Sequence, residues 1–439
     1  MEKYFRNFLT ATTLSRALGY ARDLCIAHFV GGGPMADVYF AAFRLANFFR
    51  KFVGEGGLYA GYTPVYSSLL AADKDNAKKF ALAYGNILLL ALSIIVIIAV
   101  LFTKPIVWLC VPGFRDLPDS MALAIKSTKI LFPFLLFIAM AAWNQATIQS
   151  HGKFFLSSLA PMCASIAIIA YLFITNVTGP DLLIGLAMAT TLGGLLQWVF
   201  LRPQTAKVLE IPFSLIPPKE STLSHPDLKK SFLLLGPYAF TFALEQVNSF
   251  IDTFFGSIAG SGAITALYNS SHLIQLPLGL IGVGTLVTSL PTFSKMVTRN
   301  DKAALLEAFA KKRKFILMTI VPACLLFMLA ASPIVNLLYY HGKFSHDAFL
   351  LTSMTLTAMA PSLLFYSLQK LYLTLFYANK DTKGPMTASA IQLTVNIVGC
   401  SLIVGHLGAV GIALISSLGS LVGLLSLAAI AAKKEYLKL

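Results

Sequence analysis

The sequence predicts an all-α polytopic membrane protein. Of its 439 residues, 57% are hydrophobic and only 12% are charged, and the mean hydropathy is +0.75. Apolar runs of about twenty residues recur along the whole chain, and each is long enough to cross roughly 30 Å of hydrocarbon as a helix. The alternating segments of about ten residues that build a membrane β-barrel do not occur.

Apolar periodicity and the breaks between runs predict about twelve transmembrane helices. They are expected near residues 5–30, 36–68, 77–102, 122–149, 154–176, 181–201, 229–257, 262–293, 306–339, 348–378, 385–404 and 408–431. The first is not expected to be a cleavable signal, because it carries charges in its core and lacks a small-residue cleavage site.

The Pro-rich stretch 201–230 divides the chain into two sets of six helices, expected as lobes at 1–220 and 221–439. The halves resemble each other weakly, and Pro64 pairs with Pro291 within matching segments. An even number of helices in each half predicts two pseudo-symmetric lobes of one orientation around a central cavity near the bilayer midplane. A chance match between two apolar halves is the alternative.

The net charge of +15 does not indicate a nucleic-acid partner, because the basic residues follow the topology. With the N-terminus in the cytoplasm, most basic residues of the connections fall on the cytoplasmic side. The outer connections carry only Lys104, Arg115, Lys126, Lys129 and Lys343. This positive-inside bias predicts that both termini are cytoplasmic.

The motifs of enzymes and metal sites are absent from the sequence. The five cysteines have no metal or redox spacing, so we interpret them as small apolar residues of a helical bundle. GLIGVG (279–284) partly imitates a dinucleotide fingerprint, but an apolar helix lacks the required βαβ context. We therefore predict no catalytic residue, no metal and no cofactor.

A polar stripe runs along the first predicted helix. At 100° per residue, Ser15, Arg16, Gly19, Arg22 and Asp23 fall within an arc of about 120°. Charges at the bilayer centre cost several kcal/mol each and usually face a bundle interior or a wet cavity. The stripe is thus expected to line such a cavity, with Asp23 partly neutralising Arg22.

The second predicted helix repeats this pattern. Asp37, Arg44, Lys51 and Glu55 lie on one line of a straight helix, whereas Arg50 points elsewhere. The GEGG motif that follows can bend or unwind the helix locally. The excess of guanidinium groups over carboxylates in the two helices favours a phosphate or pyrophosphate ligand, because guanidinium forms bidentate hydrogen bonds with phosphate.

The second half holds fewer ionisable residues within its apolar runs: Glu245, Asp252, His272 and Lys370. Glu245 and Asp252 are seven residues apart and share a helix face, so they could hold a coupling cation, either Na⁺ or H⁺. The alternative for all these charges is internal pairing that holds the helices in register.

At these residues the chain resembles the MurJ/MviN family, bacterial lipid II flippases of the multidrug/oligosaccharidyl-lipid/polysaccharide exporter superfamily. The resemblance rests on LSRALGYARD, on GGGPMADVYFAAFRLANFFRKFVGEGG and on YTPVY, with QLPLGLIGVGT, YYHGKF and KDTKGP further on. It covers essentially the whole chain. It implies transport of an undecaprenyl-pyrophosphate-linked muropeptide from the cytoplasmic to the outer leaflet, with cell-wall synthesis machinery as a further partner.

The resemblance also implies roles for single residues. Arg16, Arg22 and Arg50 would engage the headgroup, and Asp37 would be an essential acid. The helical wheel instead favours Arg44 and Lys51 over Arg50. We rank Arg50 higher, because GEGG makes a straight wheel unreliable there.

Two departures from the family pattern bear on the substrate. His272 stands where the family usually has a cavity arginine, and Ser271 stands where Asp is common. A histidine donates a hydrogen bond but is charged only when its pKa allows. Lys370, where the family often has lysine, could supply the charge. The family generally has fourteen spans, so about twelve imply either a reduced groove for the lipid tail or a substrate that differs from the family's.

The sequence favours alternating access driven by membrane potential or an ion gradient. One charge crossing 100 mV is worth about 2.3 kcal/mol, and a cation returning through Asp252 could act similarly. A multidrug cation antiporter is a rival function, but it would prefer an acid-lined first lobe, whereas this first lobe is net basic. The family signature disfavours a flippase for another polyprenyl-linked glycan, but His272 and the absent last two spans keep this alternative open. A scaffold for cell-wall enzymes would not need Arg16 or Arg22 in a cavity.

Overall fold

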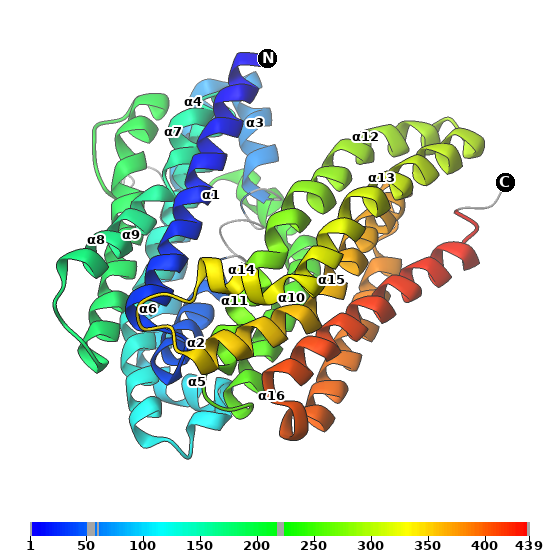
Figure 1. Ribbon diagram of the computed structural model, residues 1–439. Helices are drawn as coiled ribbons and strands as arrows, with labels where there is room; N and C mark the ends of the chain where they lie inside the picture. Colours follow the sequence, from blue (N-terminus) through cyan, green and yellow to red (C-terminus); the bar gives the residue numbers. More distant parts are fainter. Residues whose placement is uncertain (1, 51–57, 59–60, 217–223, 437–439) are drawn as a thin grey trace. The chain divides into compact units, whose positions relative to one another are not determined.

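The computed structural model consists of α-helices joined by short connections (Figure 1). It describes residues 2–50, 58, 61–216 and 224–436. No β-strand occurs in this part of the chain. The all-α polytopic membrane class predicted from the apolar runs is confirmed.

The chain divides into two compact units. The first consists of Met1–Val30, Val38–Cys110 and Phe114–Gln246, and the second of Gly31–Asp37, Val111–Gly113 and Val247–Leu439. Two short segments from the first half of the sequence therefore belong, by their contacts, to the second unit.

The helices of the first half account for nearly all of its described residues. They are α1 (Glu2–Val30), α2 (Pro34–Arg50), α3 (Thr63–Ala72), α4 (Lys74–Leu101), α5 (Thr103–Cys110), the 3₁₀ turn η2 (Pro112–Phe114), α6 (Pro118–Ser150), α7 (Phe154–Leu159), α8 (Met162–Ile174) and α9 (Pro180–Leu209). Helix α10 (Pro226–Ile258) follows the Pro-rich connection and contributes residues to both units.

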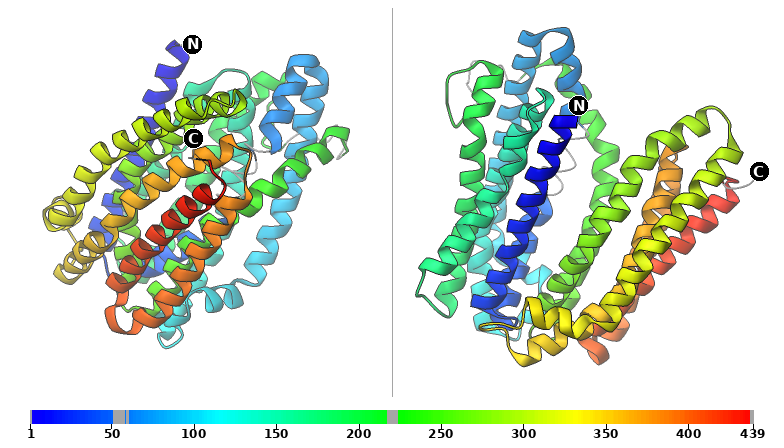
Figure 2. Two further views of the ribbon diagram at one scale, coloured as in Figure 1. Left: turned by 90° about the vertical axis from the view of Figure 1, so that its right-hand side faces the viewer. Right: turned by 45° about the horizontal axis from the view of Figure 1, so that its top comes forward.

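The second half contains longer helices with more interruptions. They are α11 (Ala263–Pro277), the π-helical turn η3 (Leu278–Val283), α12 (Gly284–Thr298), α13 (Lys302–Leu329), α14 (Ala331–Leu338), α15 (His346–Ala378) and α16 (Lys383–Lys433). Within the second unit, α12 and α13 form a hairpin, and α15 lies along α16 (Figure 2).

Side-chain caps determine where several helices begin. Asp73 precedes α4, and its carboxylate accepts hydrogen bonds from the N–H groups of Asp75 and Asn76. Asp301 accepts from Ala304 at the start of α13. These contacts satisfy N–H groups that have no partner within the first helical turn.

Each predicted span contains helix, but the structure interrupts several of them. The π-helical turn η3 divides the eighth, and the ninth bends by 77° between α13 and α14. The last two form one helix, α16, with a kink at Gly408. In the described residues, six helices are long and apolar enough to cross a membrane, or seven with the bent pair. Helix α1 is not among them, and it carries Arg16, Arg22 and Asp23.

An aromatic cluster fixes α3 in the first unit. The Tyr62 ring stacks on Phe80 of α4 with ring centroids 5.7 Å apart. Its hydroxyl hydrogen-bonds Thr147 Oγ1 of α6 at 2.7 Å. Next to Tyr62, Tyr66 hydrogen-bonds His151 Nε2 at 2.8 Å. Helix α3 is thus held by packing and by hydrogen bonds after a stretch that includes undescribed residues.

In the second unit, the carboxylate of Asp381 links α15 and α16. At the end of α16, Lys434 Nζ donates to Asp381 Oδ2 at 2.5 Å and Tyr436 donates to the same oxygen at 3.1 Å. The other oxygen accepts from the N–H groups of Lys383 and Gly384. One carboxylate therefore joins the α15–α16 turn to the end of the last helix.

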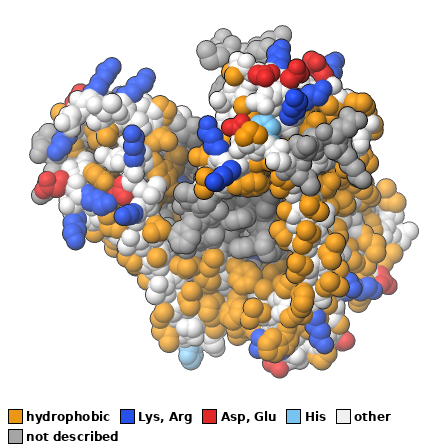
Figure 3. Space-filling view, turned by 180° about the vertical axis from the view of Figure 1, so that it is seen from behind, with side chains coloured by type: hydrophobic (Ala, Val, Ile, Leu, Met, Phe, Trp, Pro, Cys, Tyr) orange, Lys and Arg blue, Asp and Glu red, His pale blue; other side chains and the backbone are white. Residues whose placement is uncertain are grey.

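Large apolar side chains are exposed along the flanks of many helices. Ile174, Leu329 and Leu402 expose 80%, 83% and 72% of their surface. On the face drawn in Figure 3, hydrophobic side chains cover broad areas, and most Lys and Arg side chains lie outside them. A surface of this kind suits hydrocarbon and not water.

Candidate functional site

The charged stripe of α1 contains one tight ion pair. Arg22 Nε and Nη2 both donate to Asp23 Oδ1, at 2.9 and 2.7 Å. The Asp23 side chain is 2% exposed and that of Arg22 is 18% exposed. A carboxylate so deeply buried needs a cationic partner, and the adjacent guanidinium provides it.

Arg16 lies six residues earlier on the same stripe and is in a different environment. Its side chain is exposed, and it has no hydrogen bond or ion pair to any described residue. Ser15 beside it is half-buried. Six residues of helix correspond to roughly 9 Å along the axis. The stripe therefore places an arginine paired with Asp23 and an arginine without a described partner at two positions along one helix.

Asp37, in the first turn of α2, binds the beginning of α11. Its Oδ2 accepts the Gly262 N–H at 2.5 Å, and its Oδ1 accepts the N–H and hydroxyl of Thr265 at 2.8 and 2.7 Å. The Asp37 side chain is 2% exposed. Because first-turn N–H groups lack helical partners and carry partial positive charge, this carboxylate is the N-terminal cap of α11.

The rest of the predicted α2 line is described only in part. Arg44 lies within α2, is half-buried and has interactions. Arg50 is the last residue of that helix, but its side chain is outside the described part. Lys51 and Glu55 also lie outside the described residues. The choice between Arg44 and Arg50 therefore stays a prediction.

His272 lies on α11, two turns after the end capped by Asp37. Its ring stacks on Tyr268 with centroids 4.2 Å apart and an interplanar angle of 29°. The neighbouring Ser271 donates its hydroxyl to the Leu267 carbonyl at 2.6 Å. The capping carboxylate thus helps to determine the position of the helix that carries His272.

Lys370 lies on α15 next to a buried amide network. The side chain of Lys370 is half-buried. The adjacent Gln369 donates Nε2 to Gln392 Oε1 at 3.2 Å and to the Ser420 carbonyl at 2.6 Å, both on α16. These bonds hold the α15 turn on which Lys370 sits.

A second polar cluster lies between α10 and the two halves of α16. Ser416 donates to Asp252 Oδ1 at 3.5 Å, and Asn396 Nδ2 donates to Asn248 Oδ1 at 2.9 Å. The Oδ1 atom of Asn396 is buried and has no hydrogen-bond partner among the described residues. Carboxylate, amide and hydroxyl oxygens are the ligands of hard cations. The Glu245 side chain lies outside the described part.

Sequence reasoning missed the amide and hydroxyl members of this cluster. Asn248 and Asp252 are four residues apart on α10 and so share a face, a signal that was present in the sequence. It also missed Arg202, which is fully buried and donates Nε to the Ser214 carbonyl at 2.5 Å. Arg202 holds the start of the Pro-rich connection within the first unit.

Comparison with known proteins identifies the family of the chain. A family model described as lipid II flippase MurJ matches residues 26–438. The chain belongs to the MurJ family. A probable lipid II flippase MurJ of Rhizobium tropici is 30% identical over 422 residues, which cover 93% of this chain and 77% of that protein. Its counterpart from Vibrio cholerae is 30% identical over 420 residues, covering 93% and 78%.

Solved structures agree with this assignment to the MurJ family. A lipid II flippase MurJ in an inward closed conformation matches with a TM-score of 0.79 and 26% identity, covering 98% of this chain and 89% of that one. An inward-facing multidrug resistance transporter of the MATE family matches with a TM-score of 0.76 at 15% identity, which shows the shared fold. As a MurJ family member, the chain is a multi-pass bacterial inner-membrane transporter and not an enzyme.

Proposed function

We propose that this protein flips lipid II, the undecaprenyl-pyrophosphate-linked peptidoglycan precursor, from the cytoplasmic to the outer leaflet. Membership of the MurJ family supports this cargo. The observation that carries the chemistry is the α1 stripe, where Arg16 has no described partner and Arg22 is held by Asp23. Guanidinium groups bind pyrophosphate through paired, charge-assisted hydrogen bonds.

In the proposed cycle, the arginines replace water around the pyrophosphate while the prenyl tail stays in lipid. Arg16 meets the headgroup first, because it is exposed and no described carboxylate pairs with it. Arg22 then exchanges part of its bonding from Asp23 to the phosphate oxygens. Arg50, His272 and Lys370 complete the set of donors. The cavity opens alternately to the two sides, driven by membrane potential or an ion gradient.

The test is lipid II exposure on the outer leaflet of flippase-depleted cells. Wild type is compared with Arg16→Ala, Arg22→Ala and His272→Ala at matched expression. Arg299→Ala, which removes an exposed arginine of the α12–α13 turn, is the matched control. We expect the α1 variants to lose exposure at least tenfold and the control to keep it. If lipid II exposure were complete with every variant, the charged stripe would have only a structural role.

We further propose that the α10–α16 cluster binds the coupling cation, Na⁺ or H⁺, through Asp252 with Glu245. The Asn396 oxygen, which has no described hydrogen-bond partner, and the Ser416 hydroxyl support a site for Na⁺. The measurement is ²²Na⁺ binding to the purified chain at fixed pH. Asp252→Asn should abolish binding, while Asp116→Asn, at an exposed carboxylate, should not. Proton uptake without Na⁺ binding would identify H⁺ as the ion.

His272 supports a second candidate, a flippase for another polyprenyl-linked glycan. A neutral histidine in place of an arginine binds pyrophosphate less tightly, so the headgroup of the transported lipid could differ. The multidrug resistance transporter of the MATE family shares this fold. A multidrug cation antiporter is therefore a third candidate, but the basic α1 stripe disfavours a cationic cargo. Rescue of a different glycan pathway, without rescue of lipid II exposure, would select the other glycan. Cell-wall synthesis enzymes are proposed as partners of either flippase.

A further inference from the structure

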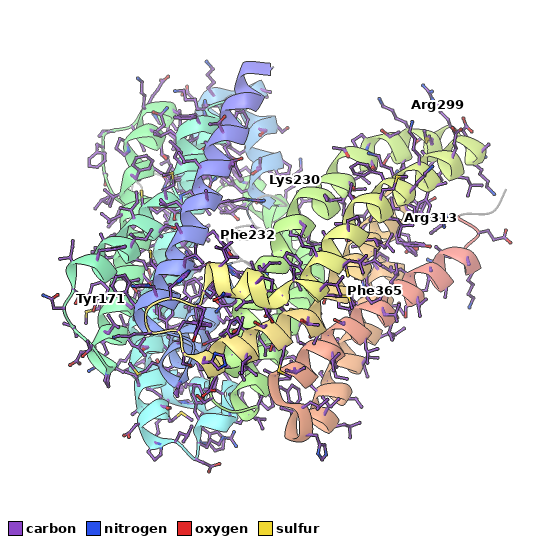
Figure 4. All side chains as sticks on the ribbon, in the orientation of Figure 1. Tyr171, Lys230, Phe232, Arg299, Arg313 and Phe365 are labelled. Atoms are coloured by element: carbon purple, nitrogen blue, oxygen red, sulfur yellow. The ribbon has the colours of Figure 1, made fainter. Side chains whose placement is uncertain are left out.

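The hairpin of α12 and α13 carries a dense group of positive charges. Seven basic residues against two acidic ones give residues 295–314 a net charge of +5. The basic residues are Lys295, Arg299, Lys302, Lys311, Lys312, Arg313 and Lys314. Figure 4 labels Arg299 at the turn and Arg313 on α13.

Within the part of the chain that the structure describes, no ion pair neutralises these cations. None of the seven side chains forms a hydrogen bond or an ion pair with a described residue. Of the two acidic residues, Asp301 uses its carboxylate to cap α13, where it accepts the Ala304 N–H at 3.0 Å. Six of the seven basic side chains are exposed, and Lys312 is half-buried. The charge is therefore free to attract anions from outside.

Packing determines which face of α13 points outward. Leu305, Phe309, Ile316 and Ile320 are buried, and the Phe309 ring contacts Tyr372 of α15 with centroids 5.2 Å apart. At 100° per residue these four fall within an arc of about 60°. The opposite face carries Lys311 and Lys314, followed by large exposed apolar residues. These are Phe315 (51% exposed), Met318 (65%), Leu325 (48%) and Leu329 (83%).

One line of α13 thus changes from basic to apolar within a single turn. Lys311 precedes Phe315 by four residues, roughly 6 Å of helix. The headgroup layer on each side of the hydrocarbon is about 5–8 Å thick. With Phe315 at the hydrocarbon edge, the ammonium groups of Lys311 and Lys314 lie at the depth of the lipid phosphates. Lys302 is 13 residues before Phe315, or roughly 20 Å along the axis, and lies beyond that layer.

We propose that Lys311 and Lys314 form a binding site for the phosphate of an anionic phospholipid. The acyl chains of the same lipid lie along Phe315 and Met318. Two features select a phospholipid as the occupant: the complementary charge, and the continuity of the basic pair with an apolar surface on one helix line. A soluble acidic partner would not need that apolar continuation. The site does not depend on the cargo of the transporter.

Native mass spectrometry of the full chain in nonionic detergent tests the proposal. Dioleoyl phosphatidylglycerol and dioleoyl phosphatidylcholine are titrated separately, and the dissociation constant of the first bound lipid is compared. Wild type should prefer phosphatidylglycerol by roughly tenfold, since each lysine near an anionic lipid contributes a several-fold gain. Lys311→Gln with Lys314→Gln should bring the ratio close to one.

Two controls make the test specific. Arg299→Gln with Lys302→Gln removes the same charge from the same hairpin, but beyond the headgroup depth, and should keep the preference. Lys311→Arg with Lys314→Arg should keep it too. An equal loss in the two Gln variants would overturn the site in favour of general charge attraction. A preference unchanged by Lys311→Gln with Lys314→Gln would also overturn it, and would leave the basic pair to a soluble acidic partner.

Discussion

At the scale of a single residue, the Asp37 carboxylate supplies acceptors that the first turn of α11 lacks. It receives three hydrogen bonds from Gly262 and Thr265 and is almost fully buried. The family resemblance implies an essential acid at this position. The contacts supply a physical reason for such a requirement, because the carboxylate holds the helix that carries His272.

Replacing Asp37 by Ala should lower the free energy of unfolding by about 3 kcal/mol, since two N–H groups and a hydroxyl lose their acceptor. A lower thermal midpoint of the purified chain in detergent would report this loss. Asp37→Asn keeps one acceptor oxygen and should lose less. Asp116→Ala removes an exposed carboxylate and should change the midpoint little. Equal midpoints for Asp37→Ala and wild type would contradict the capping role.

Asp381 gives a pH-dependent prediction at the same scale. Burial raises the pKa of its carboxyl, but hydrogen bonds from Lys434, Gly384 and Tyr436 outweigh burial, and the net pKa lies below its usual value of 3.8. Because the pKa is lower in the folded state, these contacts stabilise the fold fully at a pH above the usual pKa. Their contribution is lost as the pH falls through the lowered pKa of the folded state.

Amide hydrogen exchange at the end of α16 checks this sign. After correction for intrinsic exchange, protection around Glu435 and Tyr436 should be constant near neutral pH and decrease as the pH falls below about 3.8. Asp381→Asn should remove the pH dependence and leave protection low throughout. Protection that increases on acidification would show that the pKa is shifted in the opposite direction.

At the scale of elements, close approach of backbones leaves no room for side chains. The segment 111–113 packs on the end of α10, where the Gly113 N–H donates to Ser257 Oγ at 3.1 Å. A Cβ on Gly113 would approach the Ser257 carbonyl oxygen to an impossible distance. This turn must therefore have glycine at position 113.

Gly113→Ala should consequently destabilise the chain by about 1–3 kcal/mol, because the turn or the end of α10 must move. Gly33→Ala is the matched control, since a Cβ there meets nothing within 4 Å. Thermal midpoints of the two variants in detergent give the comparison. If both variants had the thermal midpoint of wild type, the 111–113 turn would accommodate a Cβ at position 113, and the requirement for glycine would be wrong.

The helices were predictable because each requires a long apolar run, whereas their interruptions depend on packing. The bend between α13 and α14 had a local signal, since Pro333 lies in the first turn of α14. The sequence signal for the π-helical turn η3 was weaker and consisted of Pro277 and the glycines that follow it. The pairing of Arg22 with Asp23 follows from adjacency. The Asp37 cap joins residues 225 and 228 apart, which no local pattern reveals.

At the scale of the whole molecule, the positive-inside bias predicts which connections face the cytoplasm. In a chain whose five cysteines are replaced, Lys343→Cys should react in intact cells with a membrane-impermeant maleimide. Lys302→Cys should react only after permeabilisation. Both side chains are exposed, so access depends on topology alone. The reverse pattern of labelling would invert the topology and with it the leaflet of the proposed phospholipid.

The segments 31–37 and 111–113 have a consequence for any attempt to express the halves as separate polypeptides. A cut in the Pro-rich connection leaves both segments on the N-terminal fragment, although they complete the second unit. The C-terminal fragment alone would begin α11 without its carboxylate cap. The two fragments should therefore yield a stable C-terminal half only when they are synthesised together, as in split-protein complementation.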